Sequence, residues 1–292
     1  MAVKRISIAK PDIVALFEDY PQNIFDFSSL NRIFSENRTF WRLPASMSRA
    51  YFIKYLIQNA RLKKHTFPLS YGNLVRYTWG DVPLYQLLLS IKQNCHFTHY
   101  TAMFFHELTE QIPKTIYINW EQTPKPRPKQ KLEQKRIDWA FKRKTRLSQN
   151  IAEYQNIKIH LLNGMFTNNV GVTDGFGPNG EKIRLTDVER TLIDITVRPE
   201  YAGGVFEVLK AYRLARNKVS INRLVAALKK INYIYPYHQA IGFYLETAGV
   251  YKQSQIDLLA QLEMKYNFYL IHQMKDRDYS KKWRLYFPKG FK

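Results

Sequence analysis

Glu189, Arg190 and Asp194 are charged residues whose types and spacing could support chemistry on one helix. Two carboxylates and a guanidinium so close together could act as acid, base and electrostatic stabiliser. The neighbouring residues also offer a structural explanation, because Thr186 and Glu189 match the capping-box pattern of a helix start. Arg190 and Asp194 are four residues apart and can pair along a helix. We therefore expect these residues to stabilise the fold, with a direct functional surface as the alternative.

Two further patterns are compatible with metal-dependent chemistry. His96, His99 and His106 have spacings that could bring two imidazoles together, but no acidic partner stands nearby. Residues 133–135 and 263–265 both read Glu-x-Lys, a pattern of restriction-type nucleases that a Lys-rich chain also produces by chance. A nuclease needs a further acidic residue on the same sheet to hold its metal. We expect no metal, no cofactor and no catalytic residue, and we keep a diverged metal-dependent nuclease as an alternative.

The segment 47–60 predicts an amphipathic helix that begins after a Ser46 or Ser48 cap. Its apolar side consists of Phe52, Ile53, Leu56 and Ile57. Its opposite side combines hydrogen-bonding tips, a cation and flat rings, and consists of Tyr51, Lys54, Tyr55 and Gln58. Arg49 falls on the apolar side but lies at the helix start, where it can reach a phosphate. A helix with such a polar side is suited to reading base edges in the major groove of DNA.

Elements on both sides of this helix predict a winged helix-turn-helix. Helices are predicted at residues 11–20 and from residues 28–29 onward, and strand-like runs at 62–67 and 74–79 flank a turn at 68–73. Helices followed by a two-stranded ribbon are the order of that fold. The ribbon would bring phosphate-binding side chains from Lys63, Lys64, His65 and Arg76. A helical-hairpin domain with a basic surface is the alternative.

The charge of the chain favours a polyanionic partner. The 292 residues include 45 Lys and Arg against 24 Asp and Glu, which gives a net charge of +21 and a pI near 9.8. A charge of this size attracts nucleic acid, and less commonly an anionic membrane surface. Residues 27–80 alone carry nine basic residues and one acidic residue. We expect double-stranded DNA as the partner.

A second basic segment spans residues 121–147, with ten basic and three acidic residues and three prolines. It could be a second phosphate-contacting arm or a solvated loop without a specific role. The chain has one Cys, no signal-peptide pattern and no apolar run of about 20 residues. We therefore expect a cytoplasmic protein without disulfides that does not associate with the membrane.

The expected fold class is α+β, with two domains. Residues 1–82 form the winged helix-turn-helix, and residues 83–292 form a mixed α/β domain that includes the basic segment. In the second domain, short strands at 170–173 and 183–185 flank turn residues 174–180 and lead into a buried helix that starts near Thr186.

Several motifs of the second domain resemble the AbiEi family of antitoxins and transcriptional regulators. Residues 186–194 match its T-x-x-E-R-T-L-x-D signature, and residues 98–102 with His106 and Leu108 are similar to its S-H-x-T-A-L…H-G-L segment. Residues 203–204 and 241–246 resemble later landmarks, so the resemblance covers about residues 24–250. One position departs from the family, because Glu107 stands where the family usually has Gly.

The resemblance implies a type IV toxin–antitoxin system that is tied to abortive phage infection. The N-terminal domain of such an antitoxin would bind inverted repeats in the promoter and repress its own operon. Its C-terminal domain would counteract a nucleotidyltransferase toxin without a stable complex. The signature residues that could form an antitoxin surface are His99, Thr101, His106, Thr186, Glu189, Arg190 and Asp194. An RNA- or protein-binding module without its own operator is a further alternative.

Overall fold

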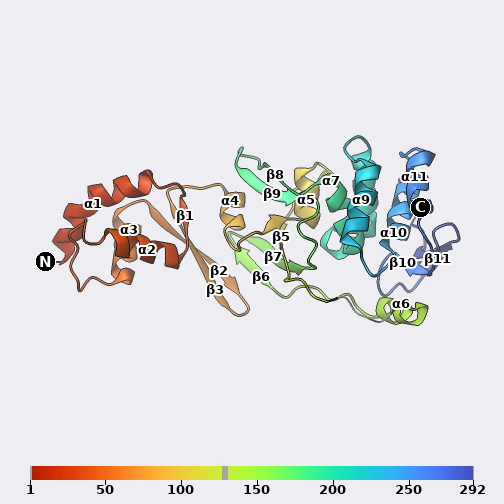
Figure 1. The fold of residues 1–292 in the computed structure, drawn as a ribbon, viewed down its shortest axis with the longest axis horizontal. Helices are drawn as coiled ribbons and strands as arrows, with labels where there is room; N and C mark the ends of the chain where they lie inside the picture. Colours follow the sequence, from red (N-terminus) through yellow and green to blue (C-terminus); the bar gives the residue numbers. More distant parts are fainter. Residues whose placement is uncertain (1, 127–130, 292) are drawn as a thin grey trace. The chain divides into compact units, whose positions relative to one another are not determined.

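The computed structural model describes residues 2–126 and 131–291, and within these ranges the chain folds as α+β (Figure 1). It divides into two compact units. The first comprises residues 1–93 with the short segments 152–156 and 176–182, and the second comprises the remainder. No helix in the described ranges is long and apolar enough to cross a membrane.

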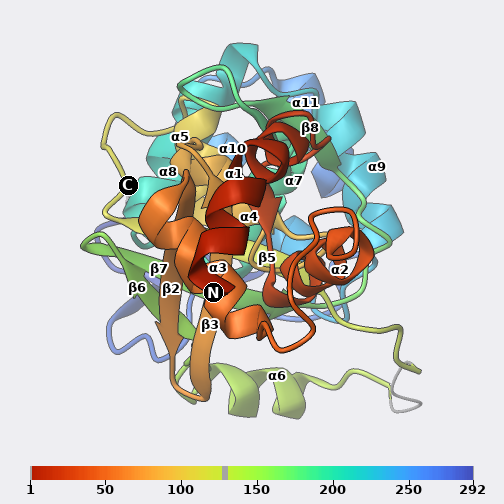
Figure 2. The ribbon, with the colours of Figure 1, turned by 90° about the vertical axis from the view of Figure 1, so that its left-hand side faces the viewer.

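The first unit combines helices with a small antiparallel sheet, and most of its elements are labelled in Figure 2. Their order is α1 (Ala2–Glu18), β1 (Ile24–Phe25), α2 (Phe27–Asn37), α3 (Arg49–Asn59), β2 (Leu62–Leu69), β3 (Gly72–Trp79) and α4 (Leu84–Leu89). The strands pair in the order β1-β3-β2. One hydrophobic cluster joins α1, α2 and α3 to this sheet, and Phe52 and Leu56 of α3 lie at its centre.

Helix α1 begins about nine residues earlier than its predicted start at residue 11. Pro11 lies inside it, although proline removes one backbone donor from a helix. Ile6, Ala9, Ile13 and Phe17 continue at helical spacing across the proline and are all buried. Tertiary packing of this apolar stripe therefore outweighs the local effect of Pro11.

The predicted ribbon is present, but its turn is tighter than expected. Strands β2 and β3 pair along their whole length, from Leu62 opposite Trp79 to Leu69 opposite Gly72. Only Ser70 and Tyr71 therefore form the turn. Pro68 lies within β2 instead of the turn. It is tolerated there because β2 is an edge strand, which does not need every backbone donor.

A mixed sheet has the order β6-β7-β5-β4-β9-β8, and most of its strand residues belong to the second unit. Its strands are β4 (His96–Phe97), β5 (Thr115–Glu121), β6 (Ile151–Tyr154), β7 (Ile157–Gly164), β8 (Val172–Phe176) and β9 (Lys182–Thr186). Strand β4 pairs parallel with β9 at Phe97 and Leu185, and antiparallel with β5. The β8–β9 hairpin leads directly into the helix that carries the signature residues.

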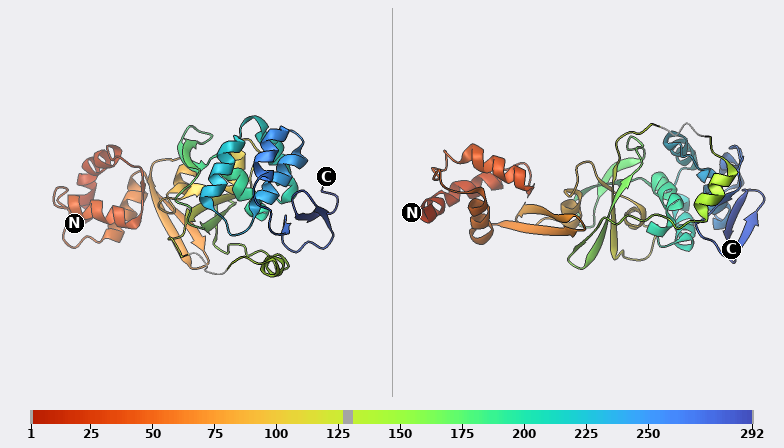
Figure 3. Two further views of the ribbon diagram at one scale, coloured as in Figure 1. Left: turned by 45° about the vertical axis from the view of Figure 1, so that its right-hand side comes forward. Right: turned by 90° about the horizontal axis from the view of Figure 1, so that it is seen from below.

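Helices form the larger hydrophobic core of the second unit (Figure 3). They are α5 (His99–Phe105), α6 (Gln134–Phe141), α7 (Val188–Val197), α8 (Val205–Leu214), α9 (Ile221–Ile231), α10 (Tyr237–Ala248) and α11 (Gln253–Ala260). A small C-terminal sheet follows, with β10 (Phe268–Tyr269), β11 (Arg277–Ser280) and β12 (Leu285–Pro288) in the order β10-β12-β11. Helix α7 packs against α5, α8, α9 and α10, and is therefore central to the unit.

Candidate functional site

The exposed face of α3 is the first candidate site. Ser48 caps the helix, and its Oγ accepts a hydrogen bond from the Tyr51 backbone N–H at 3.1 Å. Lys54 and Gln58 follow Tyr51 at helical spacing and are exposed, as are Ser48 and Arg49. The expected nucleic-acid face therefore exists as an accessible surface of polar tips and cations.

Tyr55 was expected on this face, and that expectation is wrong. Its side chain is buried, and its hydroxyl donates to Ser7 Oγ of α1 at 3.2 Å. The longer α1 supplies the neighbour that covers this side of α3. Ile57, which was expected inside, is instead exposed. The buried face of α3 therefore includes Tyr55 in place of Ile57.

The β2–β3 hairpin separates its four predicted phosphate ligands into two pairs. Lys63 and Lys64 are exposed, and the Lys63 ammonium forms an ion pair with Asp81. His65 Nδ1 is instead 2.6 Å from the Tyr154 hydroxyl, and its Nε2 is 2.9 Å from Thr78 Oγ1. Burial, assisted by the Lys63 charge, lowers the pKa of His65. Both imidazole nitrogens thus have partners within the unit, and the prediction that His65 contacts phosphate is wrong.

Arg76 is also wrongly predicted as a phosphate ligand. Its guanidinium donates to the backbone carbonyl oxygens of Val75, Ser90 and Ile91 at 2.8–2.9 Å. These contacts fasten β3 to the segment that follows α4. Arg76 lies opposite His65 in the strand register, so the two inward side chains belong to one pair of the ladder. The two side chains therefore lie on the same face of the hairpin, and their hydrogen-bond partners hold them inward.

The second candidate site is the group of signature residues at the start of α7. Asp187, and not Thr186, caps the helix, because its carboxylate accepts the Arg190 backbone N–H at 2.7 Å. Thr186 ends strand β9, and its hydroxyl is 2.8 Å from that of Thr191. The predicted capping box is therefore wrong, since the helix starts one residue later than the pattern assumed.

Glu189 stabilises a different helix from the one that contains it. Its Oε1 accepts the backbone N–H of Ser220 at 2.7 Å and the Arg223 Nη2–H at 2.8 Å. Ser220 is the cap of α9, so the Glu189 carboxylate places negative charge at the positive end of that helix. Glu189 is 1% exposed and is not available to a partner.

Arg190 and Asp194 form the predicted ion pair, but inside the unit. Arg190 Nε donates to Asp194 Oδ1 at 2.7 Å, and both side chains are less than one-tenth exposed. Arg190 Nη1 also donates to Thr167 Oγ1 and to the Val170 carbonyl oxygen, at 3.0 and 2.7 Å. Burial opposes the charge of Arg190, but Asp194 keeps its pKa above the usual value. The pair connects α7 to the loop before β8.

We call Thr98, Thr167, Glu189, Arg190 and Asp194 the buried polar centre. Contacts from distant parts of the sequence complete it. Thr98 Oγ1 donates to Asp194 Oδ2 at 3.1 Å across 96 positions of sequence. Glu121 of β5 accepts from the backbone N–H of Thr167 at 3.0 Å. Sequence reasoning missed Thr98, Thr167 and Arg223 as partners, because their separations from α7 give no local pattern.

His96, His99 and His106 occupy separate structural positions. Burial lowers the pKa of His96 and of His99 to about 4 in each case. His106 Nε2 lies 2.6 Å from the Thr186 carbonyl oxygen, and burial lowers its pKa. Thr101 Oγ1 accepts the Tyr117 backbone N–H at 2.8 Å. The described residues contain no group of three metal-ligating side chains.

Burial changes what the signature residues can do. His99, Thr101, Thr186, Glu189, Arg190 and Asp194 are all buried, and His106 is mostly covered. The alternative that they form an exposed surface is therefore wrong, whereas the structural explanation of Arg190 and Asp194 as an i,i+4 pair is confirmed. Each of the three charges has a partner within hydrogen-bonding distance, so their energetic role is to hold strands, loops and helices together.

The position of Glu107 explains how the chain departs from the resembling pattern. Its φ is +53°, in the left-handed region that glycine adopts most easily. Lys218 Nζ donates to the His106 carbonyl oxygen at 2.9 Å and pairs with the Glu107 carboxylate. The chain therefore keeps a glycine-like turn at this position, and a lysine contact accompanies it.

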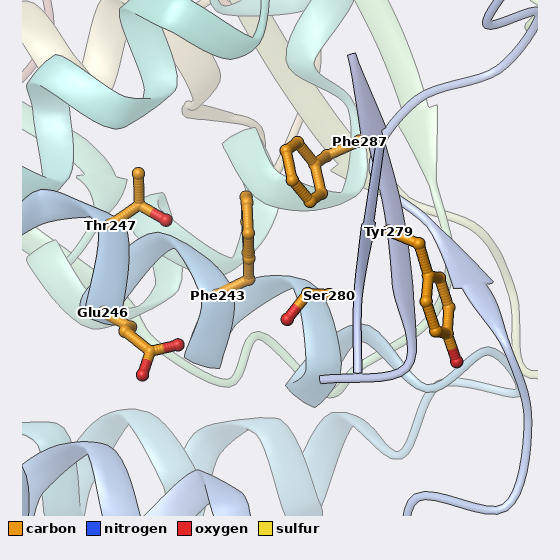
Figure 4. Close-up of a pocket in the computed structure, with 6 residues that line it drawn as sticks. All are labelled: Phe243, Glu246, Thr247, Tyr279, Ser280 and Phe287. Atoms are coloured by element: carbon orange, nitrogen blue, oxygen red, sulfur yellow. The ribbon is translucent and has the colours of Figure 1, made fainter. Parts of the chain in front are cut away.

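A surface pocket of about 450 Å³ opens in the second unit between α10 and the β11–β12 hairpin (Figure 4). Its lining residues are Phe243, Glu246, Thr247, Tyr279, Ser280 and Phe287. The Glu246 carboxylate is already engaged, since it accepts the Trp283 Nε1–H at 2.5 Å and pairs with Lys282. Trp283 lies against Gly242, where an added Cβ would approach the indole to 2.1 Å. Segment 241–246, which resembles part of the AbiEi family, thus packs against Trp283 through Gly242 and binds its indole N–H through Glu246.

Comparisons with known proteins give a fold relationship. No family model matches the sequence, and no curated protein matches it. Among solved structures, the chain is similar to the Rv2827c protein from Mycobacterium tuberculosis, with a TM-score of 0.58 and 14% sequence identity. The match covers 96% of this chain and 91% of the other. At this identity, the similarity shows that the two proteins share an α+β fold along nearly their whole length.

Proposed function

We propose that this chain is a DNA-binding transcriptional regulator whose first unit is a winged helix-turn-helix. The exposed face of α3 carries this proposal, because Arg49, Tyr51, Lys54 and Gln58 project from one capped helix. The order of α1, β1, α2, α3, β2 and β3 supports it, since in such a fold α3 would be the recognition helix and β2–β3 would be the wing.

Base reading and phosphate binding are assigned to different residues. Lys54 and Gln58 can donate to base edges in the major groove, and Tyr51 adds a ring with a polar tip. Arg49, Lys63 and Lys64 supply cations for phosphates on either side of the groove. One small module contacts few base pairs, so we infer that two copies bind an inverted repeat in the promoter of their own operon.

We further propose that the chain is the antitoxin of a type IV, AbiE-like system in the cytoplasm. This role rests on the resemblance of residues 98–108, 186–194 and 241–246 to the AbiEi family. The second unit would counteract a nucleotidyltransferase toxin without a stable complex and without catalysis of its own. Because the signature residues are buried, their task would be to maintain the unit, and other exposed residues would carry the antitoxin activity.

Binding to upstream DNA tests the regulatory proposal. The full chain is titrated against the duplex upstream of its own gene and against a scrambled duplex, over a series of salt concentrations. A specific regulator should prefer the upstream duplex by about a thousandfold or more. A steep salt slope without sequence preference would contradict an autoregulator and favour an RNA-binding module or a nuclease with a diverged site.

Separation of the two activities tests the antitoxin proposal. The chain is co-expressed with a neighbouring nucleotidyltransferase gene, and growth and promoter activity are measured together. Lys54→Ala with Gln58→Ala should lose repression and keep protection, because both residues lie in the first unit. Absence of protection by the wild-type chain would reject the antitoxin role and leave the regulator intact.

A further inference from the structure

We propose that the exposed face of α6 binds single-stranded nucleic acid through base stacking on Trp139. This surface lies in the second unit and does not rest on the regulatory proposal. Trp139 is 58% exposed, an unusual position for an indole, and the Arg143 guanidinium lies over its ring at 3.4 Å from the centroid. Such a stack fixes the orientation of the ring before any ligand arrives.

Helix α6 is anchored firmly to the body of the second unit. Ile137 and Phe141 are buried, and the Phe141 ring packs on those of Phe268 and His272 with centroids 4.9 and 4.2 Å apart. At the helix start, Gln134 exchanges two hydrogen bonds with the Asn267 backbone, at 2.8 and 2.9 Å. Figures 1 and 3 show α6 beside β10. The exposed face is thus held on a rigid support.

The charge of this face is strongly positive. Residues 131–146 carry seven basic and two acidic residues. Lys135, Lys142, Arg143, Lys144 and Arg146 are all exposed. The Asp138 carboxylate accepts from the Tyr269 hydroxyl at 2.9 Å and from the Gln134 amide at 2.8 Å. With Glu133 it leaves this range a net charge of +5, seven basic less two acidic residues. Residues 127–130 of the predicted basic segment lie outside the described residues and play no part here.

A second cation–aromatic stack lies next to α6 on the small C-terminal sheet. The Arg277 guanidinium is 4.4 Å from the centroid of the Tyr286 ring, and that ring is stacked on Tyr269. Tyr269 in turn contacts Asp138 of α6 through its hydroxyl. The Tyr286 ring is thus already covered, whereas Arg277 is exposed and offers a further cation for a phosphate of the strand that stacks on Trp139.

This chemistry distinguishes single strands from duplexes. Bases in a duplex are already stacked on one another and present only their edges, so an indole face contributes little. An unpaired base presents its flat face, and stacking on an aromatic side chain is tolerant of base identity. A basic surface with aromatic rings therefore fits a single strand of RNA or DNA, with little sequence preference.

The test measures binding of the full chain to fluorescein-labelled oligo(U) and oligo(dT) of about 12 nucleotides, the upper range of one such site. Excess unlabelled scrambled duplex occupies the duplex-binding surface. Trp139→Ala should bind both single strands about tenfold more weakly, whereas Trp139→Phe should stay within about twofold because it retains a ring. Affinity for the upstream duplex should not change. Stronger binding of oligo(U) than oligo(dT) would identify RNA as the ligand, and the reverse would identify DNA.

Matched variants separate stacking from general charge. Phe206→Ala removes another exposed aromatic ring, on α8, and Lys229→Gln with Lys230→Gln removes two exposed charges on α9. Both should bind single strands nearly as the wild type does, whereas Lys142→Gln with Lys144→Gln should bind them more weakly. The proposal would be overturned if the two lysine pairs lost single-strand binding equally, or if Trp139→Ala bound single strands as the wild type does. It would also be overturned if Trp139→Ala weakened duplex binding as much as single-strand binding.

Discussion

The face of α3 and the buried polar centre at α7 both carry charged and hydrogen-bonding side chains, but in opposite environments. On α3, Arg49 and Lys54 are exposed, and the hydrogen-bonding capacity of the face is directed to solvent. At α7, Arg190 and Asp194 are buried and engaged with each other and with Thr98 and Thr167. The charges of α3 are accessible to a partner, whereas those of α7 connect elements and are surrounded by hydrogen-bond partners.

This comparison teaches that a motif resemblance and a functional surface need not coincide. The most specific motif of the sequence, residues 186–194, lies in the interior and holds α7, α9 and the loop before β8 together. The accessible cations belong instead to segments whose sequences are less distinctive. Changes in the two regions should therefore differ in kind, with folding affected at α7 and binding affected at α3.

The largest expected effect follows removal of one member of the buried ion pair. Asp194→Ala leaves the Arg190 guanidinium buried without its carboxylate, which costs about 3–5 kcal/mol of unfolding free energy. Urea denaturation of the full chain measures this loss. Arg190→Met combined with Asp194→Leu removes both charges and should cost less than Asp194→Ala alone. A single variant as stable as the wild type would mean that the pair does not hold the unit together.

A pH titration tests a second property of the buried centre. The pKa of His99 is lowered to about 4 by burial, opposed by Asp194 and assisted by Arg190 and Arg198. The unfolded chain takes up the proton first, near pH 6.5, so this contribution is complete above that pH and is lost as pH falls toward 4. The slope reaches at most about 1.4 kcal/mol per pH unit.

His99→Asn isolates the contribution of this histidine. Asparagine tolerates the left-handed backbone of position 99, where φ is +50°. Unfolding free energies measured between pH 7 and 5 should depend on pH less steeply in the variant, by roughly 1 kcal/mol per unit. Carboxylates contribute equally to both proteins. An unchanged slope would show that His99 takes up its proton equally in the folded and unfolded chain.

Truncation on the exposed face of α3 should change binding and leave stability nearly intact. Lys54→Ala and Gln58→Ala should each weaken binding to the upstream duplex by about 1–3 kcal/mol, and scrambled DNA by less. Thermal unfolding should change by no more than about 0.5 kcal/mol, as for other surface substitutions. Fluorescence anisotropy with both duplexes measures the difference. If both duplexes lose equally, α3 does not read bases.

The smallest expected effect on DNA binding lies in the β2–β3 hairpin. This hairpin carries both exposed lysines and the inward Arg76, so it allows exposed and engaged cations to be compared within one element. Lys64→Ala should lower affinity for all duplexes. The slope of log affinity against log salt concentration should fall by about one, because one fewer counterion is released. Lys63→Ala should act less, because Asp81 already pairs with Lys63. Arg76→Ala should lower the thermal midpoint without altering the salt slope, since its contacts are to backbone carbonyls. An altered slope for Arg76→Ala would return that residue to the interface.

Local patterns predicted much of the molecule correctly. The α+β class, the amphipathic helix with its Ser48 cap, the β2–β3 ribbon and the Arg190–Asp194 pair follow from spacing over a few residues. Errors arose where a distant element decides exposure. Tyr55 is buried because α1 extends across it, and His65 and Arg76 face inward because partners from residues 90–91 and 154 bind them.

The sequence alone determined the charge of the chain, its helical periodicities and the short-range pairs, because each depends on residues within about two helical turns. Only the tertiary structure decided that the residues of the signature lie in the interior. Thr98 reaches Asp194 across 96 positions, and Glu189 reaches Ser220 across 31. No local pattern encodes such pairs, since the energy of a buried charge depends on which distant donors and acceptors the fold brings within 3 Å.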